Sequence, residues 1–191
     1  KALRARVKLF GNLLGDVLRS QAGGAVLVAV ETLRKGYIKL HQEENPRLRA
    51  RLSRLIRKLD PVTLTHVVRA FSTYFILANI AEEEHQHRLR YRQIRTGKLL
   101  WRGSFRNTFD ELRAQGITPE QLQGLLDRTH YIPVFTAHPT EAKRRTVLEA
   151  ARRIFVTSER LDIRRPTAWE REEIMRELEM EIQTLWKTDE V

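Results

Sequence analysis

One stretch of this sequence contains nothing that would interrupt a helix. After Pro61, neither glycine nor proline occurs before Gly97. At a rise of 1.5 Å per residue, a continuous helix over this stretch would span roughly 50 Å, which suits a large scaffold better than a compact independent domain. The apolar residues expected to share its buried face are Leu64, Val67, Val68, Phe71, Phe75 and Ala78. The stretch therefore predicts one very long helix.

Helical spacing of apolar residues also runs through most of the remaining sequence. It is interrupted at Gly23-Gly24, where we expect one helix to end and another to begin. Four further helix starts are predicted by a capping side chain, followed either by proline or by a glutamate three positions later. These starts are Asn45-Pro46, Asp60-Pro61, Thr118-Pro119 and Thr167 with Glu170.

The polar part of the long helix includes two histidines near three glutamates. His85 and His87 are two positions apart, so on a helix their side chains point in different directions and a shared metal ion is not expected. We interpret residues 82–87 as a solvated helix face.

Composition limits the classes of protein without choosing among them. Hydrophobic residues make up 41% of the chain, which is enough for a core. Lysine and arginine number 35 against 24 acidic residues, giving a net charge of +11 that would attract nucleic acid, anionic lipid, phosphorylated metabolites or an acidic partner.

The absence of cysteine excludes disulfides and thiolate chemistry. No apolar run reaches the ~20 residues of a membrane span, so we expect a cytoplasmic protein without membrane contact. Because the first residue is Lys1, we expect the numbering to begin inside a longer chain.

The segment from residue 131 to 145 differs in composition from the helical segments and contains the candidate catalytic residue. Residues 131–137 are short, apolar and rich in strand-forming types, and His138-Pro139 must leave them extended. Thr140 can cap a following helix whose N–H groups, with Lys143, Arg144 and Arg145, would favour an anion. His138 is thus a candidate acid–base residue beside a phosphate or carboxylate. The alternative is a buried histidine bonded to backbone.

Residues 134–141 read Val-Phe-Thr-Ala-His-Pro-Thr-Glu, and residues 144–146 read Arg-Arg-Thr. This pattern resembles the histidine signature of phosphoenolpyruvate carboxylases. Further segments resemble that family in the same order along the chain, so the resemblance covers nearly all of it. They are residues 13–18 (Leu-Leu-Gly-Asp-Val-Leu), 30–34 (Val-Glu-Thr-Leu-Arg), 69–72 (Arg-Ala-Phe-Ser), 77–82 (Leu-Ala-Asn-Ile-Ala-Glu) and 185–190 (Leu-Trp-Lys-Thr-Asp-Glu).

The resemblance implies Mg²⁺-dependent carboxylation of phosphoenolpyruvate by bicarbonate, giving oxaloacetate and inorganic phosphate. Bicarbonate first attacks the phosphoryl group to form carboxyphosphate and the pyruvate enolate, and the enolate then attacks the CO₂ released from carboxyphosphate. His138 would act in this second stage, as a base or as a stabiliser of carboxyphosphate. In some members the positions of Arg144 and Arg145 help bind a sugar-phosphate activator. The alternative for this pair is a solvated basic helix face.

The implied fold is mainly α: the helical N-terminal part of an α/β barrel, containing only the first barrel strand. We expect residues 1–129 to form the helical region, and residues 130–191 to form the first strand and the helices after it. His138 would lie at the carboxyl end of that strand, where such barrels place their sites. Asp189 and Glu190 are expected to support the active-site floor or domain packing.

The main departure from the family is length, since its members are several times longer. Their Mg²⁺ ligands lie far downstream, so we assign no metal ligand to this chain. We expect no carboxylase activity from this chain alone, and we expect as partners the missing C-terminal barrel portion and, by family, further copies in a tetramer.

Two other classes of protein remain open at this point. One is a non-catalytic interaction or regulatory module derived from the same family. The other is a helical nucleic-acid binder, but the arginines are spread over most helices and no recognition motif is present, so we do not expect nucleic acid as a partner.

Overall fold

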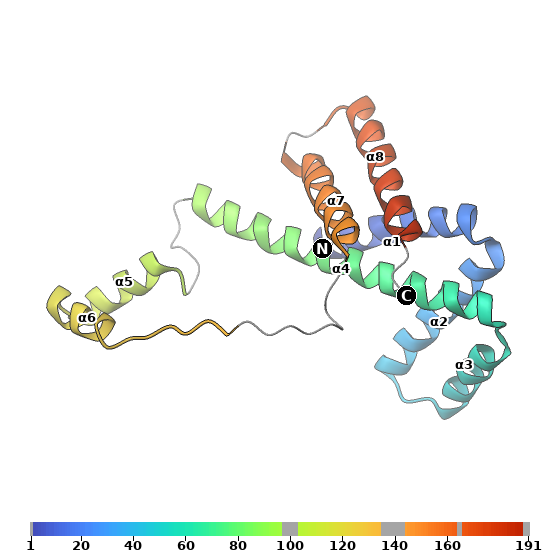
Figure 1. Ribbon diagram of the computed structural model, residues 1–191, viewed down its shortest axis with the longest axis horizontal. Helices are drawn as coiled ribbons and strands as arrows, with labels where there is room; N and C mark the ends of the chain where they lie inside the picture. Colours follow the sequence, from blue (N-terminus) through green and yellow to red (C-terminus); the bar gives the residue numbers. More distant parts are fainter. Residues whose placement is uncertain (1, 97–102, 135–143, 164–165, 189–191) are drawn as a thin grey trace. The chain divides into compact units, whose positions relative to one another are not determined.

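The computed structural model describes residues 2–96, 103–134, 144–163 and 166–188 (Figure 1). Within these residues the secondary structure is helical and no strand occurs, which confirms the mainly α prediction. The helices are α1 (Ala2–Gln21), α2 (Gly24–Gln42), α3 (Pro46–Lys58), α4 (Pro61–Arg95), α5 (Phe105–Ala114), α6 (Pro119–Leu126), α7 (Arg145–Ile163) and α8 (Ala168–Lys187).

The predicted helix boundaries are confirmed where short-range chemistry sets them. The first two helices separate at Gly23, whose φ of +88° suits glycine. The carboxamide oxygen of Asn45 accepts a hydrogen bond from the Leu48 amide at 2.9 Å, and the carboxylate of Asp60 accepts one from the Thr63 amide at 3.0 Å. Each of these side chains satisfies an N–H group that has no partner inside the helix.

The starts of α6 and α8 are full capping boxes. At α8, the Thr167 hydroxyl accepts from the Glu170 amide at 3.3 Å, and the Glu170 carboxylate accepts from the Thr167 amide at 2.7 Å. Two otherwise unpaired donors are satisfied by one pair of residues, which fixes where the helix begins.

The chain forms two compact units. The first comprises residues 1–84 and 143–191, and the second comprises residues 85–142. The predicted division after residue 129 follows the barrel architecture implied by the family and stays a prediction.

In the first unit, α7 and α8 lie side by side, and α8 also packs against α1 (Figure 1). Five helices contribute most of the core, and α3 adds Leu52 from the α2–α3 crossing. Its fully enclosed side chains include Phe10, Leu18, Leu77, Ile154, Leu178 and Ile182. Burying each such side chain stabilises the fold by about 1.5–3 kcal/mol relative to leaving it exposed. This burial holds α7 and α8 against the other helices of the first unit.

The crossing of α2 and α3 depends on a missing side chain. Gly36 is buried on α2, and a Cβ built on it would lie 2.7 Å from both terminal methyl groups of Leu52. Leu52 itself is only 2% exposed. The leucine therefore occupies the space that any other residue at position 36 would need.

The long helix is confirmed as α4, but its expected buried face was wrong in part. Val67, Ala70 and Leu77 are buried, whereas Val68 and Phe75 are 59% and 60% exposed. The apolar residues of α4 are distributed around the whole helix, so their periodicity alone did not identify the buried side. Within the first unit, α4 therefore has an apolar stripe that the described residues leave uncovered.

The strand expected over residues 131–137 is not formed in its described part, residues 131–134. These residues carry no regular structure, and Tyr131, Ile132 and Val134 are 87%, 79% and 80% exposed. A β-strand is stabilised by hydrogen bonds to a neighbouring strand, and the described residues supply none. Residues 135–137 lie outside the described residues.

Candidate functional site

The predicted catalytic residue, His138, lies outside the described residues, as do Pro139, Thr140 and Lys143. Its assigned role therefore stays a prediction. The described residues that follow this segment begin at Arg144, so the site can be built from the start of α7 onward.

Arg144 and Arg145 lie at the N-terminal end of α7, and both side chains are exposed. The Arg144 carbonyl accepts hydrogen bonds from the amides of Val147 at 3.0 Å and Leu148 at 3.2 Å, which places Arg144 at the start of the helix. Arg145 Nε donates to Glu149 Oε1 at 2.7 Å. Two guanidinium groups thus lie at the helix end that carries partial positive charge, an arrangement that favours anions.

The apolar face of α7 is buried. Val147, Ala150 and Ile154 are 2%, 0% and 0% exposed. Their burial sets the rotation of α7 about its axis and leaves Arg145 on the solvent side, 91% exposed.

α7 is tied to α8 by polar contacts beside this apolar face. Arg153 Nε lies 2.8 Å from Glu181 Oε1, and Arg160 Nη1 lies 2.5 Å from Glu177 Oε2. The Thr157 hydroxyl donates to Glu177 Oε1 at 2.9 Å. Such contacts, each modest alone, select one register between two helices that pack through apolar side chains.

A buried polar cluster connects α7 to α1 and α4. Arg6 is 6% exposed and donates from Nη1 to the Ser158 carbonyl at 2.9 Å. It also pairs with Asp162, and its Nε lies 3.2 Å from Glu84 Oε2. The Ser158 hydroxyl in turn donates to the Glu84 carboxylate. We call Arg6, Glu84, Ser158 and Asp162 the arginine cluster.

The arginine cluster corrects one expectation and adds residues that the sequence did not single out. Glu84 belongs to the acidic run interpreted as a solvated face, yet it is 1% exposed, whereas Glu82 and Glu83 are exposed. Arg6 was not among the predicted residues. The signal for it was its position, since it lies four residues before Phe10 and so shares the buried side of α1.

The end of α8 is held by aromatic and cationic side chains of α4. The Arg69 guanidinium carbon lies 5.3 Å from the ring centroid of Trp186, and the rings of His66 and Trp186 are 5.9 Å apart. Arg69 Nη2 also donates to the Thr188 carbonyl at 3.2 Å. A guanidinium stacked on tryptophan contributes about 0.5–2 kcal/mol, depending on desolvation. Asp189 and Glu190, expected to support the active-site floor or domain packing, lie outside the described residues.

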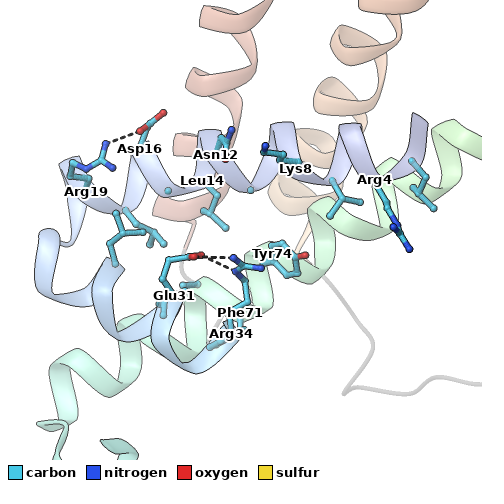
Figure 2. Close-up of a pocket in the computed structure, with 18 residues that line it drawn as sticks. Arg4, Lys8, Asn12, Leu14, Asp16, Arg19, Glu31, Arg34, Phe71 and Tyr74 are labelled. Atoms are coloured by element: carbon cyan, nitrogen blue, oxygen red, sulfur yellow. Dashed lines mark hydrogen bonds and ion pairs between the residues drawn. The ribbon is translucent and has the colours of Figure 1, made fainter. Parts of the chain in front are cut away.

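A groove opens on the first unit between α1, α2 and α4 (Figure 2). Along it, Glu31 accepts from both Nε and Nη2 of Arg34, at 2.8 and 2.9 Å. This hydrogen bonding, with help from Lys35, holds the pKa of Glu31 below its usual value, and the same contact raises the pKa of Arg34. Both residues belong to the segment 30–34 singled out in the sequence.

The described residues offer no place for a metal ion, because no three or more His, Asp or Glu side chains gather there. The Mg²⁺ ligands expected from the family were placed downstream of this chain, and that expectation stays a prediction. Nor does any described helix combine the length and apolar character that crossing a bilayer requires.

Comparison with known proteins supplies the family. The sequence profile of phosphoenolpyruvate carboxylase matches residues 3–191. Similar proteins include the phosphoenolpyruvate carboxylase of Ralstonia nicotianae, 34% identical over 97% of this chain and 19% of the relative. The carboxylase of Roseiflexus castenholzii is 38% identical over 99% of this chain and 20% of the relative.

The profile match, the small share of each relative that is covered and the helical structure thus define an N-terminal, mainly helical portion of a carboxylase. The chain belongs to the phosphoenolpyruvate carboxylase family. It spans about a fifth of the length of the curated relatives it matches.

Proposed function

We propose that this chain supplies the helical framework and one catalytic histidine of an enzyme that carboxylates phosphoenolpyruvate with bicarbonate. The observation that carries the proposal is the family match over residues 3–191, which includes the His138 segment. The start of α7 supports it, since Arg144 and Arg145 lie on the helix terminus that follows this segment and would attract a phosphorylated acid.

The proposed role of His138 is proton transfer in the second stage of the reaction. In the first stage a bicarbonate oxygen bonds to phosphorus as the bond from phosphorus to the enol oxygen breaks, giving carboxyphosphate and the enolate. His138 then accepts the carboxyphosphate proton, so that phosphate and CO₂ separate. The enolate carbon finally bonds to CO₂ to form oxaloacetate. Imidazole suits this task because it titrates near neutral pH.

For Arg144 and Arg145 we propose binding of a sugar-phosphate activator. Guanidinium groups match phosphate oxygens in charge and geometry. Both side chains are exposed at the start of α7, so a ligand could reach them.

For the complete enzyme we propose further properties on family grounds. It would use Mg²⁺ held by residues outside this chain, be regulated allosterically, form a tetramer and work in the cytoplasm in the tricarboxylic acid cycle, without nucleic acid or membrane as a partner. Residues 1–129 would be its helical region, and residues 130–191 the start of its barrel, where the segment after 130 would pair with other strands.

The test is a chimera of the Roseiflexus castenholzii carboxylase, in which this chain replaces the homologous portion. Oxaloacetate formation is followed by coupled NADH oxidation. In the chimera, His138→Asn should lower turnover by about 10²-fold or more, the scale of a lost acid–base group. The matched control is His130→Asn, an exposed histidine eight residues earlier in the chain, which should retain turnover within about 2-fold.

The chain of residues 1–191 should show no turnover alone. Normal turnover by the His138→Asn chimera, with unchanged thermal unfolding, would contradict the catalytic assignment. A chimera that folds and tetramerises but never turns over would favour the non-catalytic module instead.

A further inference from the structure

The groove between α1, α2 and α4 encloses about 900 Å³ in the first unit (Figure 2). Residues of α1 line it from Leu3 to Arg19, which corresponds to a length of about 24 Å at 1.5 Å per residue. Its partly exposed apolar surface comes from three helices, so an occupant would contact all of them. That surface is formed by Leu3, Val7, Leu27, Phe71 and Tyr74.

The charges along the groove are unevenly neutralised. Asp16 pairs with Arg19 at 2.8 Å, and Glu31 pairs with Arg34. Arg4 and Lys8 lie one helical turn apart toward the N-terminal end of α1, and neither has an ion-pair partner among the residues that the structure describes. One end of the groove therefore presents two cations, and the other end is internally balanced.

The apolar surface extends beyond the groove along α4. Phe71 and Tyr74 line the groove, and Phe75, whose ring lies 5.9 Å from that of Tyr74, is 60% exposed. Val68 lies on the same side of the helix and is 59% exposed. Apolar surface rimmed by charged side chains is one of the features of protein interaction sites.

From these observations we propose that the groove is a docking site for an amphipathic helix of a protein partner, with acidic residues at one end. An α-helix of about 16 residues matches the 24 Å length, and its apolar stripe would cover Val7, Phe71 and Tyr74. Carboxylates one turn apart on that helix would meet Arg4 and Lys8. The ion pairs at the other end of the groove are already neutral, so the docked helix needs no charged residue there. The acidic end of that helix therefore determines which way round it lies in the groove.

A fluorescein-labelled designed peptide of about 16 Leu, Ala and Glu residues tests the proposal, with leucines along one face and two glutamates near one end. Binding to the chain of residues 1–191 is measured by fluorescence anisotropy at low and high salt. We expect saturable binding that weakens with salt. The double variant Arg4→Glu with Lys8→Glu should bind roughly tenfold more weakly, as expected for reversing two ion pairs.

The matched control reverses two charges of the same spacing on α3, Arg47→Glu with Arg51→Glu. Both residues are exposed, and no ion pair of either is present in the described residues. This control should bind like the wild type, and both double variants should unfold at the wild-type temperature.

Three results would overturn the proposal. The first is no binding of the acidic peptide. The second is equal weakening by the α1 and α3 variants, which would show a nonspecific charge effect. The third is self-association of the unlabelled chain in sedimentation that the Arg4→Glu with Lys8→Glu variant abolishes, because a second copy would then be the occupant.

Discussion

Arg6 on α1 and Glu84 on α4 form an ion pair at 3.2 Å, and their side chains are 5% and 1% exposed. The residues are far apart in sequence, and both also contact Ser158 on α7. One buried cation and one buried anion thus hold three helices in a single register. Ion pairs removed from water contribute little net stability, but the loss of one partner is costly because the other charge stays buried.

The first prediction concerns this pair. Glu84→Gln should lower the free energy of unfolding by about 3 kcal/mol, because it leaves the Arg6 guanidinium inside the protein without its anion on α4. Replacing both residues, Arg6→Met with Glu84→Met, should recover more than half of that loss. Urea denaturation of the wild type and the two variants compares the two losses. A double variant no more stable than Glu84→Gln would contradict the prediction.

The second prediction compares two helical glycines. Gly11 has no contact closer than 3.9 Å for an added Cβ, so Gly11→Ala should stabilise the protein by up to about 1 kcal/mol through helix propensity. Gly36→Ala should destabilise it by about 1 kcal/mol or more, because the new Cβ would lie 2.7 Å from the methyl groups of Leu52. The two variants make the same chemical change, so opposite shifts in thermal unfolding would isolate the packing effect. Shifts of the same sign would contradict it.

The third prediction concerns acid stability. The pKa of Glu31 is lower in the folded protein than in the unfolded chain, so the ionised carboxylate adds to the free energy of unfolding. This stabilisation is complete above the unfolded-state pKa of about 4.3 and is lost as the pH falls through the folded-state pKa. The side chain is 38% exposed, so this contribution should be below about 1 kcal/mol. Glu31→Gln should lower stability at pH 6 and reduce its loss between pH 6 and 3. An unchanged pH dependence in Glu31→Gln would contradict this prediction.

The fourth prediction concerns the capping box of α8. Thr167→Ala removes the hydroxyl that accepts from the Glu170 amide and should cost about 1 kcal/mol. The control is Thr184→Ala on the same helix, whose hydroxyl only donates to the Met180 carbonyl, so its stability should change by less than about 0.5 kcal/mol. Equal losses in circular dichroism melts would show that the box does not stabilise α8.

The sequence predicted those features that depend on neighbours along the chain. Asn45, Asp60 and Thr167 cap helices as expected, since a cap involves residues only three positions apart. A further short helix, α5, was missed, although Ser104 accepts from the Asn107 amide at 3.2 Å in the same manner. The capping signal was present there, but no proline marked it.

Features that depend on distant parts of the chain were not predictable in the same way. Glu84 is buried because Arg6 and Ser158 approach it from other helices, and nothing near Glu84 in the sequence indicates this. The buried side of α4 was similarly ambiguous, since Val67 and Val68 are equally apolar but only Val67 is covered. The apolar pattern of residues 131–134 predicted a strand, but a strand needs a partner to pair with.

The fit of Leu52 against Gly36 has a consequence for sequence variation in the family. The side chains at positions 36 and 52 occupy the same space, so these positions cannot change independently. A methyl group added at position 36 requires a smaller or differently branched side chain at position 52. Positions 36 and 52 should therefore covary among relatives, with glycine retained wherever leucine is.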